Sequence, residues 1–184
     1  MVNRSKRTLI QFDQIRFASR GTKGFFKALG FPCFRFILYK RIIEGYSKWN
    51  PIGSVFRFLY KIMQIRYGLQ IAHYTKIGGG FYMAHYGNIV ISCHAIIGEN
   101  CNIGQGVTIG RINKGKGKGA PKIGDKVWIG PNAVLVGNIS IGNNVLIAPL
   151  SFVNFDIPDN CMAIGNPAKI VEGKTSEDYI NFHN

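Results

Sequence analysis

Histidine is the side chain in this sequence best suited to acid–base chemistry, and one of the four histidines lies in a segment that interrupts a repeat. His85 belongs to the segment Met83-Ala84-His85-Tyr86-Gly87. A neutral imidazole, with an ordinary pKa of about 6.5, accepts a proton at cellular pH and can act as a general base. An ordinary loop histidine is the alternative interpretation. His73 and His94 occupy repeat positions that favour hydrogen-bonded structural roles, and His183 lies in the tail.

A run of glycines and lysines at residues 111–120 is the second segment with chemical potential. The chain has 23 basic and 9 acidic residues, a net charge of +14. Such an excess predicts an anionic partner, namely a phosphorylated cofactor, an anionic membrane surface or nucleic acid. No nucleic-acid recognition motif accompanies the charge, so we expect no nucleic-acid partner. The four cysteines form no CxxC pair, which favours buried reduced thiols over a zinc or redox motif.

The element that must position these segments is a six-residue repeat. An aliphatic residue returns every six positions, often followed by a small residue, as in Ile97-Gly98 and Ile103-Gly104. This period fits neither a helix nor an alternating strand, and it predicts a parallel β-helix in which each hexapeptide forms one side of a three-sided coil. The repeat positions are Ile71, Ile77, Met83, Ile91, Ile97, Ile103, Ile109, Ile123, Ile129, Leu135, Ile141, Ile147 and Val153.

The repeat slips twice, and both slips coincide with the segments described above. Two extra residues fall within 83–90 and about eight within 111–120. Because each side of a coil must keep its length, the extra residues are predicted to be extruded as loops, where function tends to be carried. We interpret 111–120 as a flexible arm that covers a cleft and attracts phosphate, with a solvated surface loop as the alternative.

The remaining residues predict three regions: a helical region at 1–70, the β-helix at 71–171 and a polar tail at 172–184. Asn50-Pro51 is a favourable helix start. The helix that follows has one polar edge, formed by Arg57, Lys61 and Gln64, and is otherwise expected to be mostly buried. No apolar stretch is long enough to span a bilayer, which predicts a cytoplasmic protein. Interleaved aromatic and basic residues at 25–67 leave peripheral contact with the inner membrane face open.

From Ile71 to Val171 the sequence resembles the hexapeptide-repeat O-acetyltransferases of the serine acetyltransferase type, and particularly their relatives in polysaccharide biosynthesis. The matching segments are Lys76-Ile77-Gly78-Gly79-Gly80, the His85 segment, Gln105-Gly106-Val107-Thr108-Ile109-Gly110, Pro121-Lys122-Ile123-Gly124 and Gly165-Asn166-Pro167-Ala168-Lys169-Ile170-Val171. The resemblance implies a left-handed β-helix, an exception to the usual right-handed crossover. It also implies a homotrimer with acetyl-CoA in the groove between neighbouring subunits, and it leaves open a dimer of trimers.

The resemblance assigns roles to individual residues. His85 matches the catalytic histidine, which deprotonates an alcohol as that alcohol attacks the thioester, while a backbone N–H stabilises the oxyanion. The residues expected to bind the acetyl donor are Gly110, Gly130 and Ala148 along the pantetheine arm, and Lys114 and Lys169 at the phosphates. The residues expected to line the acceptor site are Gln70, Ala84, Tyr86 and His94. No metal is expected.

The sequence departs from the serine acetyltransferase pattern where that pattern recognises the charged ends of serine. Ala84 replaces an aspartate, Gln70 replaces the acidic partner of the imidazole, and Gly119-Ala120 replace an Arg-His pair. These departures favour acetylation of a sugar hydroxyl in a capsule, O-antigen or exopolysaccharide precursor. Serine O-acetylation in cysteine biosynthesis is the alternative.

Two further functions are compatible with the fold. A γ-type carbonic anhydrase needs three histidines around zinc, and the spacing of His85 and His94 does not fit its local pattern. A trimeric β-helix that binds without catalysis is favoured only by the loss of the acidic partner at Gln70.

Overall fold

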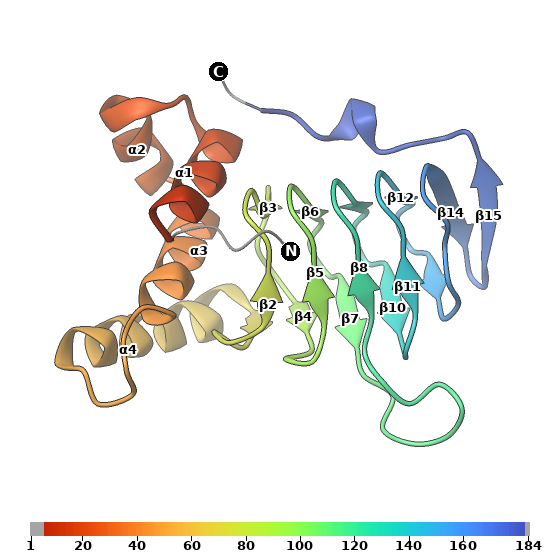
Figure 1. The fold of residues 1–184 in the computed structure, drawn as a ribbon, viewed down its shortest axis with the longest axis horizontal. Helices are drawn as coiled ribbons and strands as arrows, with labels where there is room; N and C mark the ends of the chain where they lie inside the picture. Colours follow the sequence, from red (N-terminus) through yellow and green to blue (C-terminus); the bar gives the residue numbers. More distant parts are fainter. Residues whose placement is uncertain (1–5, 183–184) are drawn as a thin grey trace.

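The computed structural model describes residues 6–182, with side chains from Thr8 onward, as a stack of coils with helices at one end (Figure 1). The helices are α1 (Lys6–Phe17), α2 (Gly21–Leu29), α3 (Pro32–Ile43) and α4 (Pro51–Tyr67), and a 3-10 helix spans Glu177–Tyr179. The strands are β1 (Leu69–Ile71), β2 (Lys76–Ile77), β3 (Tyr82–Met83), β4 (Ile89–Ile91), β5 (Ile96–Ile97), β6 (Asn102–Ile103), β7 (Thr108–Gly110), β8 (Lys122–Ile123), β9 (Trp128–Ile129), β10 (Val134–Val136), β11 (Ser140–Ile141), β12 (Leu146–Ile147), β13 (Phe152–Val153), β14 (Cys161–Gly165) and β15 (Ala168–Glu172).

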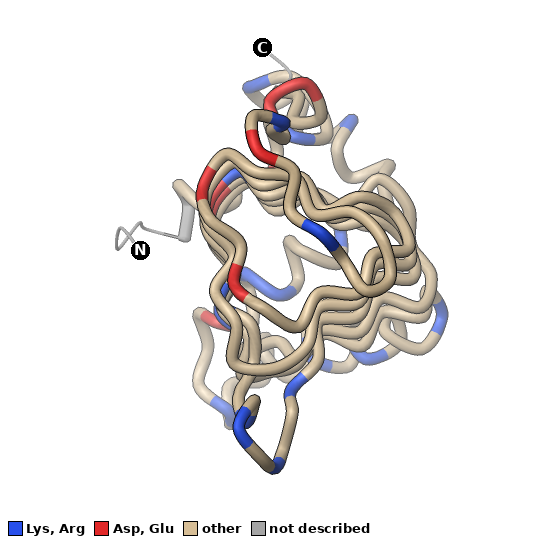
Figure 2. The backbone as a smooth tube through the Cα atoms, turned by 90° about the vertical axis from the view of Figure 1, so that its right-hand side faces the viewer, with Lys and Arg blue, Asp and Glu red and all other residues tan. Residues whose placement is uncertain are grey.

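Successive strands join successive sheets, so the chain winds around a three-sided prism (Figure 2). The β1 sheet has the order β1-β4-β7-β10-β13, the β2 sheet has the order β11-β8-β5-β2, and the β3 sheet has the order β15-β14-β12-β9-β6-β3. Every pairing is parallel except β14 with β15, which closes the stack. The predicted parallel β-helix with an N-terminal helical region is confirmed.

The repeat residues form the core of this prism. All the predicted repeat positions are buried and belong to one cluster. The glycine directly after an aliphatic position lies against the backbone of the next coil: a Cβ on Gly98 would lie 2.4 Å from the Gly124 carbonyl oxygen. Three residues after the aliphatic position, the backbone turns through a left-handed residue, which is commonly glycine or asparagine. At equivalent places of one corner, Gly106, Asn132 and Leu150 have φ values of 71°, 58° and 62°. Glycine and asparagine adopt this conformation readily, whereas leucine does so only with strain.

Two corners flank the β1 sheet, and each contains one of the predicted loops. The His85 corner joins the β3 sheet to the β1 sheet and comprises residues 84–88, 104–107, 130–133 and 148–151. The Arg111 corner joins the β1 sheet to the β2 sheet and comprises residues 72–75, 92–95, 111–121 and 137–139. The third corner lies under α1 and the C-terminal tail: Gly79 faces Leu9 and Phe12, and the Ser176 N–H donates to the Asn144 carbonyl.

The long loop is a hairpin closed by backbone hydrogen bonds. Ile112 and Gly119 exchange two backbone hydrogen bonds, of 2.9 and 3.0 Å. The Asn138 N–H donates to the Gly117 carbonyl, and the Ile112 side chain packs close to Gly137. The loop is therefore a hairpin fastened to the next coil by contacts that join positions no local pattern connects. Its flexibility and its covering of a cleft stay predictions. Figure 2 shows this loop, with its lysine and arginine positions in blue, extending away from the prism.

Helix α4 begins and ends as the sequence predicts but is not mostly buried. The Asn50 side chain accepts from the Gly53 N–H, and Gly68 ends the helix with φ 63°. One face, with Tyr60 and Met63, is buried. The opposite face exposes an apolar stripe of Val55, Phe58, Ile62 and Ile65. The expectation failed because an apolar pattern identifies surface that avoids water but not whether the same chain covers it.

A buried ion pair fastens the helical region to the first coil. The Asp13 carboxylate on α1 accepts from Arg41 Nε on α3 at 2.9 Å and from the N–H groups of Gly80 and Phe81. The Arg41 guanidinium also donates to the carbonyls of Ile77 and Gly78. Both side chains are about 1% exposed, so the helices hold the first coil through charge as well as packing.

No helix within residues 6–182 is long and apolar enough to cross a membrane.

Candidate active site

His85 lies on the surface, in the two-residue insertion at the His85 corner. Its side chain is exposed, and no hydrogen bond to it is seen among the described residues. The insertion rests on the junction of α4 and β1: the rings of Tyr67 and Tyr86 are 4.6 Å apart, and the Ile89 N–H donates to the Gly68 carbonyl. The imidazole is therefore presented outward from a supported turn, where a bound hydroxyl can reach it.

The Arg111 corner brings together a second set of polar side chains. Arg111 Nη1 lies 2.7 Å from His94 Nε2. The hydrogen bond that the Tyr74 hydroxyl shares with Cys93 raises the pKa of the Tyr74 phenol. A hollow of about 380 Å³ is lined by Tyr74, Lys76, Cys93, His94, Ala95 and Ile96. No carboxylate lines it.

The predicted site residues divide between these two corners. Ala84, Tyr86, Gly130 and Ala148 lie with His85 on the His85 corner, whereas His94 and Lys114 lie on the Arg111 corner, with Gly110 at the strand end leading into it. Gln70 is exposed at the base of the β1 sheet, in register with Val90, and no hydrogen bond joins it to His85 within the described residues. Lys169 is exposed on β15. One protomer alone does not bring the two groups together.

Arg111 was missed by sequence reasoning, as were Tyr74 and Cys93. The run from 111 to 120 drew attention to its lysines, yet its first residue makes the specific contact. Arg111 and His94 are 17 residues apart and meet because their segments lie in adjacent coils of one corner. The slip in the repeat located the loop, and nothing in the local sequence pointed to the pair.

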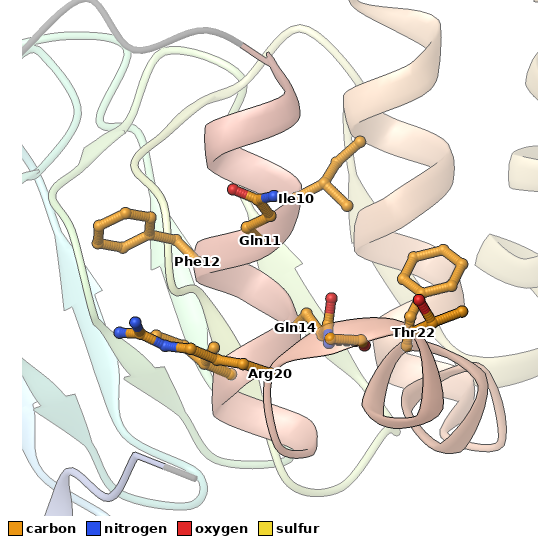
Figure 3. A pocket seen from close by; sticks show the side chains of 9 residues that line it. Ile10, Gln11, Phe12, Gln14, Arg20 and Thr22 are labelled. Atoms are coloured by element: carbon orange, nitrogen blue, oxygen red, sulfur yellow. Dashed lines mark hydrogen bonds between the residues drawn. The ribbon is translucent and has the colours of Figure 1, made fainter. Parts of the chain in front are cut away.

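A larger hollow lies elsewhere, between α1 and α2, and does not resemble a catalytic site (Figure 3). It measures about 750 Å³ and includes no histidine, cysteine or carboxylate; Gln14 in its wall donates to the carbonyls of Ser19 and Gly21. Its lining residues are Ile10, Gln11, Phe12, Gln14, Ile15, Arg20, Gly21, Thr22 and Phe25. Within residues 6–182 no group of three or more histidine, cysteine or acidic side chains is placed to hold a metal ion.

Comparison with known proteins identifies relatives of the chain. The bacterial transferase hexapeptide family (six repeats) matches residues 120–154. The serine acetyltransferase of Synechococcus elongatus is 33% identical over 144 residues, which are 78% of this chain and 58% of that protein. The chloroplastic serine acetyltransferase 1 of Arabidopsis thaliana is 40% identical over 100 residues, 54% of this chain and 32% of that protein. The chain therefore spans between about a third and somewhat more than half of these relatives' length.

Solved structures with a similar fold are also those of serine acetyltransferases. A serine acetyltransferase in complex with CoA has a TM-score of 0.73 at 28% identity, covering 92% of this chain and 71% of that chain. The serine acetyltransferase of Neisseria gonorrhoeae has a TM-score of 0.73 at 31% identity, covering 90% of this chain and 64% of that chain.

These findings correct one expectation and support another. The predicted saccharide acceptor was wrong: the relatives and structural neighbours are serine acetyltransferases, which supports the alternative. Ala84, Gly119 and Ala120 carry no charge, but the charges of an acceptor can be met by side chains at other positions. The β-helix is the predicted left-handed one. The chain belongs to the hexapeptide-repeat transferases, and the relatives it resembles in sequence and fold are serine acetyltransferases.

Proposed function

We propose that this chain is an acetyl-CoA-dependent O-acetyltransferase whose acceptor is serine and whose general base is His85. The observation that carries the proposal is the similarity to serine acetyltransferases in both sequence and fold, including a neighbour solved with CoA and another solved with serine. The exposed position of His85 in an extruded corner supports its role. Saccharides are not proposed as acceptors.

The chemistry requires one proton carrier. The His85 imidazole takes the proton of the serine hydroxyl as its oxygen attacks the thioester carbonyl of acetyl-CoA. The tetrahedral oxyanion collapses, the carbon–sulfur bond breaks, and the departing thiolate receives the proton from the imidazolium. No covalent enzyme intermediate is needed. The backbone donor to the oxyanion stays a prediction.

We propose a homotrimer in which the β1 sheets face a common axis. The outward residues of this sheet are in register and mainly apolar: Gln70, Val90, Thr108, Val134 and Phe152. The β2 sheet instead presents Lys76, Ile96, Lys122 and Ser140, and the β3 sheet is covered by α1 and the tail through contacts such as that of Trp128 with Tyr179. An apolar face that the chain leaves uncovered is typical of a subunit interface.

Helix α4 carries a second apolar surface, at the end of the stack before the first coil (Figure 1). It leads directly into β1 and runs roughly along the stacking direction (Figure 1). Val55, Phe58, Ile62 and Ile65 follow the alternating spacing of three and four that parallel helices use to pack around an axis. Their exposures of 58%, 67%, 43% and 74% are high for side chains of this kind. Contact between the three α4 helices therefore supports the trimer.

Cyclic symmetry then completes the site. Each β1 sheet is flanked by the His85 corner on one side and the Arg111 corner on the other, so neighbouring subunits place unlike corners together. Gly110 and Lys114 of one subunit thereby approach Gly130 and Ala148 of the next, which supports binding of acetyl-CoA in the groove between them. The cytoplasmic location, the peripheral membrane contact and the dimer of trimers stay predictions.

The test is serine-dependent release of CoA from acetyl-CoA, with sedimentation to determine subunit number. We expect turnover with serine by the wild-type protein and a loss of about 10²- to 10⁴-fold in kcat for His85→Ala, with CoA binding retained. Absence of serine turnover in a correctly folded trimer would refute the proposed acceptor. Activity that survives His85→Ala would refute the proposed base.

A further inference from the structure

The pair of Arg111 and His94 has an arrangement suited to holding an anion. A guanidinium stays protonated, so at 2.7 Å Arg111 Nη1 donates and His94 Nε2 accepts. The Arg111 edge formed by Nε and Nη2 has no hydrogen-bond partner within the described residues. That edge matches a carboxylate, which accepts two parallel hydrogen bonds from a guanidinium.

The position of Arg111 is fixed by the fold. It directly follows β7, and the hairpin closed by Ile112 and Gly119 begins at the next residue. His94 holds the other end of the side chain, so the guanidinium is restrained from both directions. The adjoining hollow contributes Lys76 and no acidic group, and the Tyr74 hydroxyl lines the same space. A small anionic group meets only positive or neutral partners here.

In the proposed trimer, symmetry places the Arg111–His94 pair of one subunit at the same height along the stack as His85 of the neighbouring subunit. A rotation about an axis parallel to the coils leaves height along the stack unchanged. His85 connects the first coil to the second, His94 belongs to the second coil, and Arg111 reaches it from the third. In the proposed trimer, the Arg111 corner of one subunit therefore faces the His85 corner of its neighbour at the same height.

From these observations we infer that Arg111, positioned by His94, binds the carboxylate of the amino-acid acceptor beside His85 of the partner subunit. The inference rests on the proposed function and deepens it, because it identifies the charged group that selects an amino acid. The pair supplies a guanidinium to a site where Gly119 and Ala120 provide no charge. His94 is a positioning residue in this arrangement and does not touch the reacting atoms.

The first test separates binding of the carboxylate from catalysis. Arg111→Ala is expected to raise the KM for serine by about 10- to 100-fold, the loss typical of a charged hydrogen bond, and to leave the KM for acetyl-CoA unchanged. Serinamide, which lacks the carboxylate, should be acetylated equally by wild type and Arg111→Ala. His94→Ala should raise the KM for serine less, and His94→Gln, whose amide oxygen can accept from Arg111, should restore part of it. Lys174→Ala, an exposed lysine of the tail, is the matched charge control.

The second test asks whether the site is shared between subunits. His85→Ala and Arg111→Ala proteins are denatured together in equal amounts, refolded and assayed at serine well below its KM. Random trimers built around shared sites should recover about a quarter of wild-type activity, because one interface in four pairs an intact His85 with an intact Arg111. Each variant refolded alone should stay at its own low level.

The outcomes are distinguishable. Absence of serine turnover by the wild-type protein means that the proposed function fails. Serine turnover with an unchanged KM in Arg111→Ala overturns the carboxylate site while the proposed function stands. A KM effect without recovery in mixed trimers overturns the placement across the interface, provided that sedimentation shows mixed trimers.

Discussion

Replacing Asp13 by asparagine should destabilise the protein strongly. Asparagine keeps the shape and one acceptor oxygen, so the N–H groups of Gly80 and Phe81 retain a partner. Its amide NH₂, however, would face the donor Nε of Arg41, which now bonds Asp13 at 2.9 Å. Arg41 would stay buried, and the only carboxylate left beside it among the described residues would be that of Glu44, 3.9 Å from Arg41 Nη1.

The magnitude follows from the burial of both partners. Removing one partner of a buried ion pair costs about 3–5 kcal/mol. For a chain of this size, each kcal/mol lowers the melting temperature by about 2–4 °C, so the expected fall is about 6–20 °C. The assay is thermal unfolding followed by circular dichroism at one fixed protein concentration, because melting of an oligomer depends on concentration.

Asp125→Asn provides the matched control. Asp125 is exposed, and its Oδ1 accepts from the Glu99 N–H at 2.7 Å, a bond that an asparagine oxygen can also accept. We expect its melting temperature to change by no more than about 2 °C, as for most surface substitutions. A fall for Asp13→Asn as small as that of the control would refute the reasoning that this ion pair holds the helices to the coils.

Three further predictions concern other parts of the molecule. Phe58→Asp should dissociate the proposed trimer, as measured by sedimentation at micromolar concentration. Phe26→Asp is the control, because Phe26 is 68% exposed and Phe58 67%, and it should leave the mass of the assembly unchanged. Equal masses for the two variants would show that α4 is not part of the interface. Leu150→Asn should raise the free energy of unfolding in urea by about 1 kcal/mol, because it relieves the backbone strain of a leucine at φ 62°. A lower free energy of unfolding would show that the contacts of the leucine side chain stabilise the protein more than the strain destabilises it. Burial and the nearby charges of Arg57 and Lys40 lower the pKa of His73, and the Glu44 carboxylate offsets only part of this effect. The unfolded state therefore binds more protons below about pH 6.5, and stability falls as pH drops through this range. His73→Gln should flatten the dependence between about pH 7 and pH 5, and an unchanged slope would contradict that origin.

The coils were predictable because the period of the sequence repeat equals the number of residues in one side of a coil. A six-residue step specifies one side of the prism, and the buried repeat positions follow from it. The two slips located the corners that carry His85 and Arg111 for the same reason: extra residues must leave the coil.

Other features depend on contacts that the sequence does not encode locally. The α4 stripe is apolar whether this chain or a second copy covers it, so its exposure could not be predicted. The Arg111–His94 pair arises from the stacking of adjacent coils. The acceptor was mispredicted because missing charges at Ala84, Gly119 and Ala120 were taken as missing from the whole site. In the proposed trimer, the groove between subunits draws residues from two corners.

The most direct test of the account is the rate of CoA release with serine by wild type and His85→Ala, both verified as folded trimers that bind CoA. The account predicts serine-dependent release by the wild type and a fall of about 10²- to 10⁴-fold in kcat for the variant. Equal rates for the two proteins, or no release with serine by the wild type, would contradict it.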